Sequence, residues 1–481
     1  MQISTMRSLD PNGILYSKDP FKELSTLCYD SREAINDCAF FCFSGTQTNG
    51  ERFIDQATKK GASLVVTENE NVERVEGISY FISSLPTRTL FAKASALFFN
   101  YPSRKLTMIG ITGTDGKTST SYFTYQLLKL FDKKIGLLNT VYYSDGNTLL
   151  RNDTHMSTPE SFFVNRSIAE AVNNGSSFFV LEATSHALSQ EFNRLCDITY
   201  DFSAYTNISS EHLEFHKTYP RYIDAKCNLA RRTKERLFIY DTNKELEKVL
   251  KSASSDKVVL TCPKIIKNDL VALTFSHNRK CYTLPFGQSY NLENAFEAAN
   301  IVSSALNIEL DKVLEKLQYL MPVKGRFQMI KNEIRRNIII DFAHTPKAYQ
   351  ALMESTLHFK KDHAFIAVFG SSGKRDSSKR PDMGRTLSLY CDHLIITEDD
   401  NRGEDLKTIY EELTSKIDDK DKVIRCDDRE KAIKTALNIS SPGDFIFLLG
   451  LGPQIGIDKG SYTKDWDEEE VVKKLIKEAK R

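Results

Sequence analysis

The sequence lacks the features that mark membrane-spanning and secreted proteins. Across its 481 residues no apolar run approaches the roughly 20 residues needed to cross a bilayer. The opening residues, MQISTMRSLDPNG, lack the apolar segment of a signal peptide. The nine cysteines are scattered and form no CxxC pair, which argues against a zinc site and favours reduced thiols. These absences predict a cytoplasmic protein with no membrane partner.

An excess of charge of either sign is also missing. Lys and Arg number 65 against 64 Asp and Glu, for a net charge of +1. A chain balanced in this way has no electrostatic reason to bind nucleic acid, although it can hold a phosphorylated ligand locally. With 41% apolar and 27% charged residues, and no internal repeat or low-complexity tract, the composition is that of an ordinary globular protein. We expect small-molecule partners and a monomer.

The chain is too long for a single core, and its patterns predict three α/β segments. Residues 1–100 alternate short apolar runs, such as CAFFCFSG and ASLVVTE, with helical stretches, which indicates a small α/β domain. Residues 101–322 begin at a linker near Tyr101 and hold LTMIGIT, SSFFVLEAT and DFSAYTN, which are typical of a mostly parallel sheet. Residues 323–481 hold RNIIIDFA, AFIAVFG, HLIITED and DFIFLLG between helical stretches, which favours a second doubly wound domain.

The stretch MIGITGTDGKTST joins a predicted strand to a predicted helix through a glycine-rich turn. The common phosphate loop requires a glycine where this chain has Ile111, so only a variant form of the loop fits. Gly113 and Gly116 would allow a tight turn whose amides face phosphate oxygens. Lys117 would pair with the β- and γ-phosphates, and the Thr118 hydroxyl would hold Mg²⁺. The alternative is a strand-to-helix turn with a chance Gly-Lys-Thr.

The loop GTDGKT resembles the ATP loop of the Mur ligase superfamily, whose usual form is GTxGKT/S, and further blocks follow in the family's order. These blocks are LEATSHAL (181–188), TNISSEHLEFH (206–216), YIDAK (222–226), GRFQMI (325–330), IIDFAHTP (339–346) and VFGSSGKRDSSKRPDMG (368–384). They are specific in combination. The resemblance implies a three-domain α/β architecture with a small UDP-binding domain, a central P-loop ATPase domain and a C-terminal Rossmann-like domain.

The N-terminal domain narrows the choice within the superfamily. YDSREAINDCAFFCFSGTQTNGERFI (29–54) and HMSTPE (155–160) are similar to the uridine-nucleotide and substrate segments of the branch that adds the third residue of the peptidoglycan stem peptide. Folylpolyglutamate synthetase shares the ATP loop but has no such first domain. The resemblance implies an ATP-dependent ligase that joins a diamino acid to UDP-MurNAc-L-Ala-D-Glu through an acyl phosphate. The alternatives are the same chemistry on a non-wall substrate, or an inactive paralogue that only binds.

The matched blocks also imply the reacting centre. The catalytic and metal-binding set is Lys117, Glu182, His212 and Lys226, with Thr118 as a further Mg²⁺ ligand. Because a bare ammonium is repelled by Mg²⁺, a lysine at this position is unexpected. The family resolves this by carbamylating the lysine with CO₂, and we expect a carbamate on Lys226. Glu182 follows the apolar run SSFFVL, at a strand's carboxyl end, where α/β proteins build their sites. The role of His186 is left open between substrate contact and structure.

The resemblance implies two further sets of binding residues. The ATP contacts are Gly113, Thr114, Asp115, Gly116, Lys117, Thr118, Asn294, Arg326, Asp341 and His344. The UDP-substrate contacts are Asp30, Ser31, Arg32, Thr46, Gln47, Thr48, Ser157, Thr158, Thr184, Gln190 and Arg194. Two extra residues precede Arg194 relative to the family's spacing, which leaves its register open.

The pocket for the incoming amino acid departs from the family pattern. Members that add meso-diaminopimelate carry DNPR, whose arginine holds the distal carboxylate through a bidentate pair. Here the segment reads Asp399, Asp400, Asn401 and Arg402. Arg375 matches a second arginine of the pocket, Gly450 is retained, and Gln454 replaces a glutamate that would hold an ammonium. The pocket keeps the arginines that would bind a substrate carboxylate and loses the glutamate that would bind a substrate ammonium. The substrate therefore stays open between meso-diaminopimelate, lysine, ornithine and other diamino acids.

Overall fold

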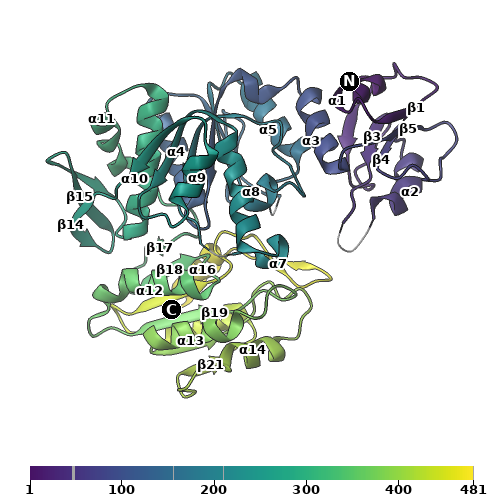
Figure 1. Cartoon of the computed structure of the whole chain (residues 1–481). Coiled ribbons are helices and arrows are strands. Elements are labelled where there is room, and N and C mark those ends of the chain that lie inside the picture. The colour runs from purple at the N-terminus through teal and green to yellow at the C-terminus, as the bar shows by residue number, and fades with distance from the viewer. Residues whose placement is uncertain (46–48, 155, 210, 480–481) are drawn as a thin grey trace. The chain divides into compact units, whose positions relative to one another are not determined.

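A computed structural model of the chain describes residues 1–45, 49–154, 156–209 and 211–479 (Figure 1). They divide into two compact units, Met1–Cys262 with Glu293–Leu317, and Pro263–Leu292 with Gln318–Arg481. None of the helices in the described ranges combines the length and the apolar character that a membrane crossing requires. All nine cysteines are free thiols, as the sequence predicts.

The N-terminal part of the first unit is a five-stranded sheet with helices on both faces. The strand order is β1-β5-β4-β3-β2, and only β1 runs antiparallel to its neighbour. Its elements are α1 (Met6–Leu9), β1 (Ile14–Tyr16), β2 (Thr26–Cys28), β3 (Cys38–Phe41), α2 (Ile54–Lys59), β4 (Leu64–Thr67), β5 (Ser79–Ile82) and α3 (Thr87–Phe98). Successive residues of β3 enter different cores: Phe40 lies in the core with Ala57 of α2, and Phe41 in the core with Phe91 of α3.

The central part of the first unit is an eight-stranded sheet in the order β13-β12-β11-β6-β10-β7-β8-β9. The strands from β13 to β7 are parallel and the last two are antiparallel, so the predicted, mostly parallel sheet is confirmed. The strands are β6 (Thr107–Thr112), β7 (Ile135–Leu138), β8 (Tyr142–Ser144), β9 (Leu149–Arg151), β10 (Phe178–Glu182), β11 (Tyr200–Tyr205), β12 (Thr233–Tyr240) and β13 (Asp256–Leu260). The helices that follow along this stretch are α4 (Lys117–Leu130), α5 (Ser161–Asn173), α6 (Ser185–Leu188), α7 (Leu213–His216), α8 (Tyr219–Arg231), α9 (Leu246–Ser252), α10 (Ser289–Leu306) and α11 (Leu310–Leu314).

The second unit contains a six-stranded sheet in the order β17-β18-β22-β19-β20-β21, of which only β17 is antiparallel. The four predicted apolar runs are its four central strands. The unit's strands are β14 (Lys264–Asp269), β15 (Ala272–His277), β16 (Lys280–Leu284), β17 (Gln328–Ile330), β18 (Asn337–Asp341), β19 (Phe365–Phe369), β20 (His393–Ile396), β21 (Val423–Arg425), β22 (Phe445–Leu449), β23 (Ile457–Asp458) and β24 (Thr463–Lys464). Its helices are α12 (Pro346–Lys360), α13 (Arg380–Tyr390), α14 (Leu406–Thr414), α15 (Arg429–Ile439) and α16 (Glu468–Ala479).

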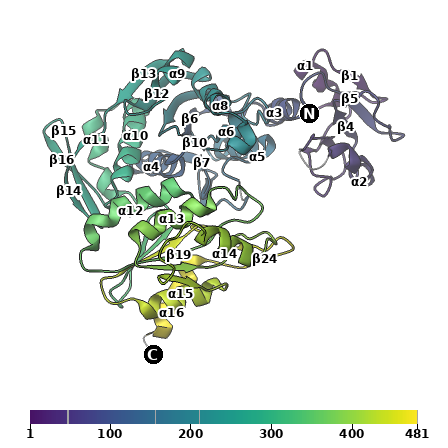
Figure 2. The ribbon, with the colours of Figure 1, turned by 60° about the horizontal axis from the view of Figure 1, so that its bottom comes forward.

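Helices cover both faces of this six-stranded sheet, with α12 and α13 on one side and α15 and α16 on the other (Figure 2). Successive residues of a strand alternate between the two cores. Ile339 of β18 lies in the core with Met353 of α12, whereas Ile338 and Ile340 lie in the core with Ile433 of α15. This alternation is that of the doubly wound domain that the sequence predicts.

Three α/β sheets therefore follow one another along the chain, in agreement with the predicted α/β class and three-domain architecture. The boundaries at residues 100 and 322 stay predictions. At the first of them the connection is a short 3₁₀ helix, Pro102–Lys105, that begins after Tyr101. Pro102 and Ser103 are buried there, and the turn packs against α5, so the predicted linker is part of the folded unit.

Candidate active site

The glycine-rich loop lies between β6 and α4, at the carboxyl end of a central parallel strand. Gly113 and Gly116 have φ angles of 152° and 82°, which disfavour residues with a side chain. A Cβ on Gly113 would lie 1.9 Å from the Thr206 hydroxyl, and one on Gly116 would lie 2.4 Å from the Asn294 side-chain oxygen. Gly116 is also the N-cap of α4 and offers no side chain to cap it. The first amides of α4 are thus available to an anion.

The segment that follows β11 forms hydrogen bonds to the glycine-rich loop. The backbone amide of Thr114 donates to the carbonyl of Asn207 at 2.8 Å, and that of Asp115 to the Asn207 side-chain oxygen at 2.9 Å. The Thr114 hydroxyl also lies 2.8 Å from the hydroxyl of Tyr222 on α8. These bonds fix the loop before any ligand binds, which lowers the ordering cost of binding a phosphate chain.

Two predicted metal ligands, Thr118 and Glu182, contact each other beside the glycine-rich loop. The Thr118 hydroxyl, in the first turn of α4, donates to a carboxylate oxygen of Glu182 at 3.0 Å. Glu182 is the last residue of β10 and is buried. The Lys117 ammonium donates to the carbonyl of Thr114 at 2.8 Å, which holds the side chain back over the loop. A hydroxyl, a carboxylate and a cation are therefore grouped around the loop.

The sequence reading missed Thr140. Its backbone amide and its hydroxyl donate to the Glu182 carboxylate at 2.9 and 3.0 Å, and the hydroxyl also lies 2.8 Å from that of Ser157. Thr140 thus connects the predicted metal ligand to a predicted substrate residue. The available signal was its position just after the apolar run of β7, which neighbours β10 in the sheet.

Lys226 on α8 is a buried lysine, with 1% of its side chain exposed. Its ammonium lies within hydrogen-bond distance of the Gly113 carbonyl and 4.9 Å from the centre of the Tyr222 ring. Burial, with the nearby charge of Lys117, lowers the pKa of Lys226 well below its ordinary value. A lowered pKa favours the neutral amine, which is the form that reacts with CO₂.

His212 and His186 lie in an aromatic cluster beside α6 and α7. Their ring centres are 4.7 Å apart, and His186 stacks on Phe215 at 4.4 Å. Burial, with the neighbouring His212 and His216, lowers the pKa of His186 to about 3, so its imidazole is neutral. This favours a packing role for His186. His212 keeps an exposed edge, and its part in metal binding stays a prediction.

The predicted substrate segments of the central sheet lie together. The Thr158 hydroxyl donates to the carbonyl of Glu182 at 2.7 Å and accepts from the Thr184 amide at 3.1 Å. The Arg194 guanidinium donates to the Thr158 carbonyl at 3.0 Å and pairs with the Glu160 carboxylate at 2.9 Å. Arg194 therefore lies in this group despite its altered spacing. Gln190 is exposed, and among the described residues no hydrogen bond joins it to the group.

A second arginine, from helix α3, also pairs with Glu160. Arg88 of α3 pairs with it at 2.8 Å, and its guanidinium lies 4.3 Å from the Phe43 ring and 4.6 Å from the Phe192 ring. No motif in the sequence pointed to Arg88. Of the predicted uridine contacts, Arg32 pairs with Asp30 at 2.5 Å and Ser31 donates to Gln56 at 2.7 Å. Thr46, Gln47 and Thr48 lie outside the described residues.

The predicted nucleotide contacts of the second unit surround the carboxyl end of β18. Asp341 accepts hydrogen bonds from the amides of Phe327 and Ala343, both at 2.7 Å. Arg326 lies over the Phe342 ring at 4.7 Å, and the His344 ring lies 5.0 Å from the same ring. The structure thus groups Arg326, Asp341 and His344. Asn294, by contrast, lies beside the glycine-rich loop, where its side-chain oxygen accepts from the Thr120 hydroxyl at 3.2 Å.

Arg402, the predicted anchor of the amino acid, is already paired within the chain. Its guanidinium lies 3.4 Å from the Asp400 carboxylate and 3.3 Å from that of Asp458, on the β23–β24 hairpin. Burial raises the pKa of Asp400. A substrate carboxylate would therefore have to compete with two resident carboxylates for this guanidinium.

The remaining pocket residues differ in their exposure. Asp399 is buried, burial raises its pKa, and a Cβ on Gly450 would lie 2.2 Å from its carboxylate. The buried side-chain oxygens of Asn401 and Gln454 have no hydrogen-bond partner within the described part of the chain. Two orphaned acceptors fit a ligand that donates, such as an ammonium. Arg375 is exposed.

The donor set suits Mg²⁺ held partly by a ligand. Within the described ranges no three His, Cys, Asp and Glu side chains are grouped so as to hold a metal ion by themselves. Mg²⁺ commonly takes one or two carboxylates, together with phosphate oxygens and water. Glu182, the Thr118 hydroxyl and an added carbamate on Lys226 would supply such a partial shell.

Two family models match the chain, that of the Mur ligase middle domain over residues 111–330 and that of the Mur ligase glutamate ligase domain over residues 325–452. The UDP-N-acetylmuramyl-tripeptide synthetase of Borreliella burgdorferi is 33% identical, over 94% of this chain and 93% of the relative. The UDP-N-acetylmuramoyl-L-alanyl-D-glutamate–2,6-diaminopimelate ligase of Caldanaerobacter subterraneus subsp. tengcongensis is 32% identical, over 96% of this chain and 97% of the relative. A solved structure of a ligase with that second name aligns over 100% of both chains, with a TM-score of 0.63 and 23% identity.

Proposed function

The chain belongs to the Mur ligase family, and we propose that it adds the third residue, a diamino acid, to UDP-MurNAc-L-Ala-D-Glu. It is an ATP-dependent amide ligase of peptidoglycan precursor synthesis. The observation that carries the assignment is the group formed by the glycine-rich loop, Lys117, the Thr118–Glu182 pair and the buried Lys226 at the carboxyl end of β6.

The proposed reaction begins with transfer of the γ-phosphoryl group of ATP to the D-glutamyl carboxylate. The amine of the incoming amino acid then attacks the acyl phosphate, and phosphate leaves through a tetrahedral intermediate. Because the phosphoryl group and the carboxylate repel each other, the protein's task is positioning and charge neutralisation. Lys117 and the free amides of α4 would supply positive charge at the phosphates, and Thr158, Thr184 and Arg194 would hold the peptide end of the substrate.

We propose that Lys226 is carbamylated. The neutral amine attacks CO₂, loses a proton and becomes an anionic oxygen ligand. Its burial and lowered pKa support this step, since the free energy of keeping an ammonium there is unfavourable. Mg²⁺, held by this carbamate, Thr118, Glu182 and His212, would supply charge neutralisation at the phosphates.

The cellular setting is proposed from the same chemistry. A UDP-linked precursor and ATP are cytoplasmic metabolites, and nine free thiols fit a reducing compartment, so we place the enzyme in the cytoplasm. We further propose that it acts as a monomer on small-molecule substrates.

The assignment is tested by measuring ATP consumption and product mass with UDP-MurNAc-L-Ala-D-Glu and a panel of amino acids. Ligation of meso-diaminopimelate, lysine or ornithine supports it. Ligation only of acceptors without a UDP-sugar would point to a non-wall ligase. ATP binding without any ligation would point to an inactive paralogue.

The distal end of the amino acid gives a prediction for Arg402. If the substrate is diaminopimelate, Arg402→Ala removes the guanidinium that would bind the distal carboxylate. We expect the apparent KM for diaminopimelate to rise about 30- to 100-fold. This is at the lower end of the losses that follow removal of one partner of a buried charge pair, because Asp400 and Asp458 already share this guanidinium. The KM for ATP should not change. Steady-state kinetics with each substrate varied in turn measures both values.

Lysine and ornithine lack the distal carboxylate, so their KM values should barely respond to Arg402→Ala. Arg425→Ala is the matched control, because this exposed arginine at the end of β21 pairs with Asp427 and belongs to no predicted site. A parent enzyme that uses lysine or ornithine efficiently, and diaminopimelate poorly, would overturn the proposed binding of a distal carboxylate by Arg402 and Arg375.

A further inference from the structure

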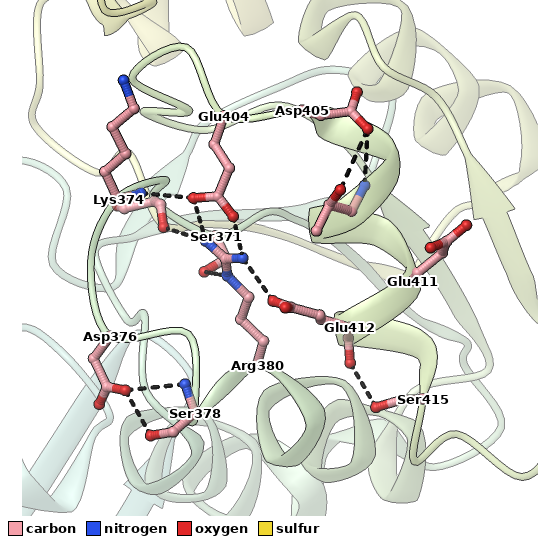
Figure 3. A network of polar contacts seen from close by, with 12 residues as sticks. Ser371, Lys374, Asp376, Ser378, Arg380, Glu404, Asp405, Glu411, Glu412 and Ser415 are labelled. Atoms are coloured by element: carbon pink, nitrogen blue, oxygen red, sulfur yellow. Dashed lines mark hydrogen bonds and ion pairs between the residues drawn. The ribbon is translucent and has the colours of Figure 1, made fainter.

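Arg380, in the first turn of α13, is a fully buried arginine with 0% of its side chain exposed (Figure 3). Its Nη1 donates to a carboxylate oxygen of Glu404 and to one of Glu412, both at 2.6 Å. Its Nη2 donates to Glu404 at 3.1 Å and to the Ser372 carbonyl at 3.0 Å, and its Nε donates to the Ser371 hydroxyl at 3.3 Å. All three nitrogens are satisfied, as a buried guanidinium requires.

Two loops that carry the predicted amino-acid contacts lie around this network. The Arg375 loop (370–376) follows β19, and the Arg402 loop (397–405) follows β20. Because β19 and β20 are parallel neighbours, both loops leave the sheet at the carboxyl ends of its strands. The two arginines thus reach the pocket from separate loops, and their spacing depends on how these loops are held together.

Glu404 joins the two loops through the guanidinium. Its carboxylate, which belongs to the Arg402 loop, accepts from Arg380 and also from the backbone amide of Lys374 in the Arg375 loop, at 2.6 Å. Figure 3 shows the Lys374 side chain directed away, so that only its backbone takes part. The Ser371 and Ser372 contacts of Arg380 hold the same loop from its other end.

The loops also touch backbone to backbone. The Gly373 amide donates to the Asp400 carbonyl at 2.8 Å, and a Cβ on Gly373 would lie 1.9 Å from the Asn401 carbonyl oxygen. The Arg402 guanidinium in turn lies 3.4 Å from the Gly373 carbonyl. At this separation, a shift of either loop changes the position of the Arg402 side chain.

We propose that Arg380 and Glu404 form a positioning pair that fixes the distance between the Arg375 and Arg402 loops and so sets the affinity for the incoming amino acid. The inference rests on the proposed function for the identity of that ligand. Neither residue of the positioning pair would touch the substrate, because Arg380 is buried and the Glu404 carboxylate is turned toward Arg380.

Glu412 provides a matched control within the same network. It bonds the same nitrogen of Arg380 at the same distance as Glu404, but it lies on α14, outside both loops. Glu412→Ala therefore removes an ion pair of the same length to the same nitrogen, although Glu404 also accepts from Nη2, and it does not release the Arg375 loop. Any effect that arises only from the stability of the Arg380 network should appear in both variants.

The test compares Glu404→Ala with Glu412→Ala by steady-state kinetics, with each substrate varied in turn. We expect Glu404→Ala to raise the KM for the amino acid about 10- to 100-fold, as small displacements of binding groups do, while the KM for ATP stays within about threefold. Glu412→Ala should change neither value by more than about threefold. Thermal unfolding of both variants measures the structural cost separately.

Amide hydrogen exchange gives a readout that needs no turnover. The amides of Gly373 and Lys374 should exchange faster in Glu404→Ala than in Glu412→Ala. Equal kinetic and exchange effects in the two variants, or an unchanged KM for the amino acid in Glu404→Ala, would overturn the positioning pair. A parent enzyme that ligates no amino acid would instead overturn the proposed function, and exchange alone would then decide whether the pair restrains the loops.

Discussion

Lys117→Ala is expected to lower the rate of ATP-dependent ligation about a thousandfold or more, because a positive charge at the transferring phosphoryl group is worth that much in related chemistry. The side chain lies over the glycine-rich loop, with its ammonium 2.8 Å from the Thr114 carbonyl. Among the described residues no hydrogen bond or ion pair joins Lys117 to the sugar-binding segments, so binding of UDP-MurNAc-L-Ala-D-Glu should persist. ADP release measures the first effect, and calorimetric titration with the UDP-substrate measures the second.

Lys129→Ala is the control for this variant. It changes the same residue type on the same helix, but in the last turn of α4 and on an exposed surface. It should leave both the rate and the binding unchanged. If Lys117→Ala turned over near the parent rate, the loop would not be the site of phosphoryl transfer.

Lys226→Met is expected to lower the rate about a hundredfold or more, since a metal-bound carbamate would contribute several kcal/mol of charge stabilisation. Met keeps an apolar side chain that reaches as far as Cε, with sulfur in place of Cδ, and lacks the nitrogen, which separates lost chemistry from lost packing. The parent enzyme should lose activity when CO₂ is removed from the buffer and regain it when bicarbonate is added. Native mass measurement should find the parent heavier than its sequence by one CO₂.

The activity of Lys226→Met should not depend on CO₂, because this variant has no amine at position 226 to modify. A short carboxylate such as formate or acetate, given to Lys226→Ala, should restore part of the activity by placing oxygens where the carbamate would lie. A fully active parent enzyme that carries an unmodified Lys226 under these conditions would refute the carbamate.

The central strands of both large sheets could be predicted because they are buried on both faces. LTMIGIT, SSFFVLEAT and RNIIIDFA are nearly continuous apolar runs, and each is a parallel strand in the structure. The strands that sequence reading missed carry a weaker pattern. β14 has mostly exposed side chains, and β8 and β9 are short strands at the sheet edge, so little burial marks them in the sequence.

Part of the candidate active site could also be predicted, because some of its residues lie in recognisable motifs. Lys117 and Thr118 were identified from the glycine-rich turn, and Glu182 from a block that resembles that of the Mur ligases, and the structure brings the three residues together. Burial of charged residues was not predictable in the same way. Arg375 and Arg380 lie five positions apart in one motif, yet the first is exposed and the second fully buried. Only tertiary packing distinguishes two such arginines, because their local sequence is equally polar.

The alternation of strand residues between two cores in the second unit has a consequence for how substitutions combine. Ile339 and Ile340 are covalent neighbours, but the sheet lies between their side chains, and they contact different helices. Truncating both would open two separate cavities with no common lining, and the two losses in free energy of unfolding would simply add. Ile339 and Met353, fourteen positions apart, share one core and would not behave independently. In this domain, epistasis follows the face of the sheet and not the order of the chain.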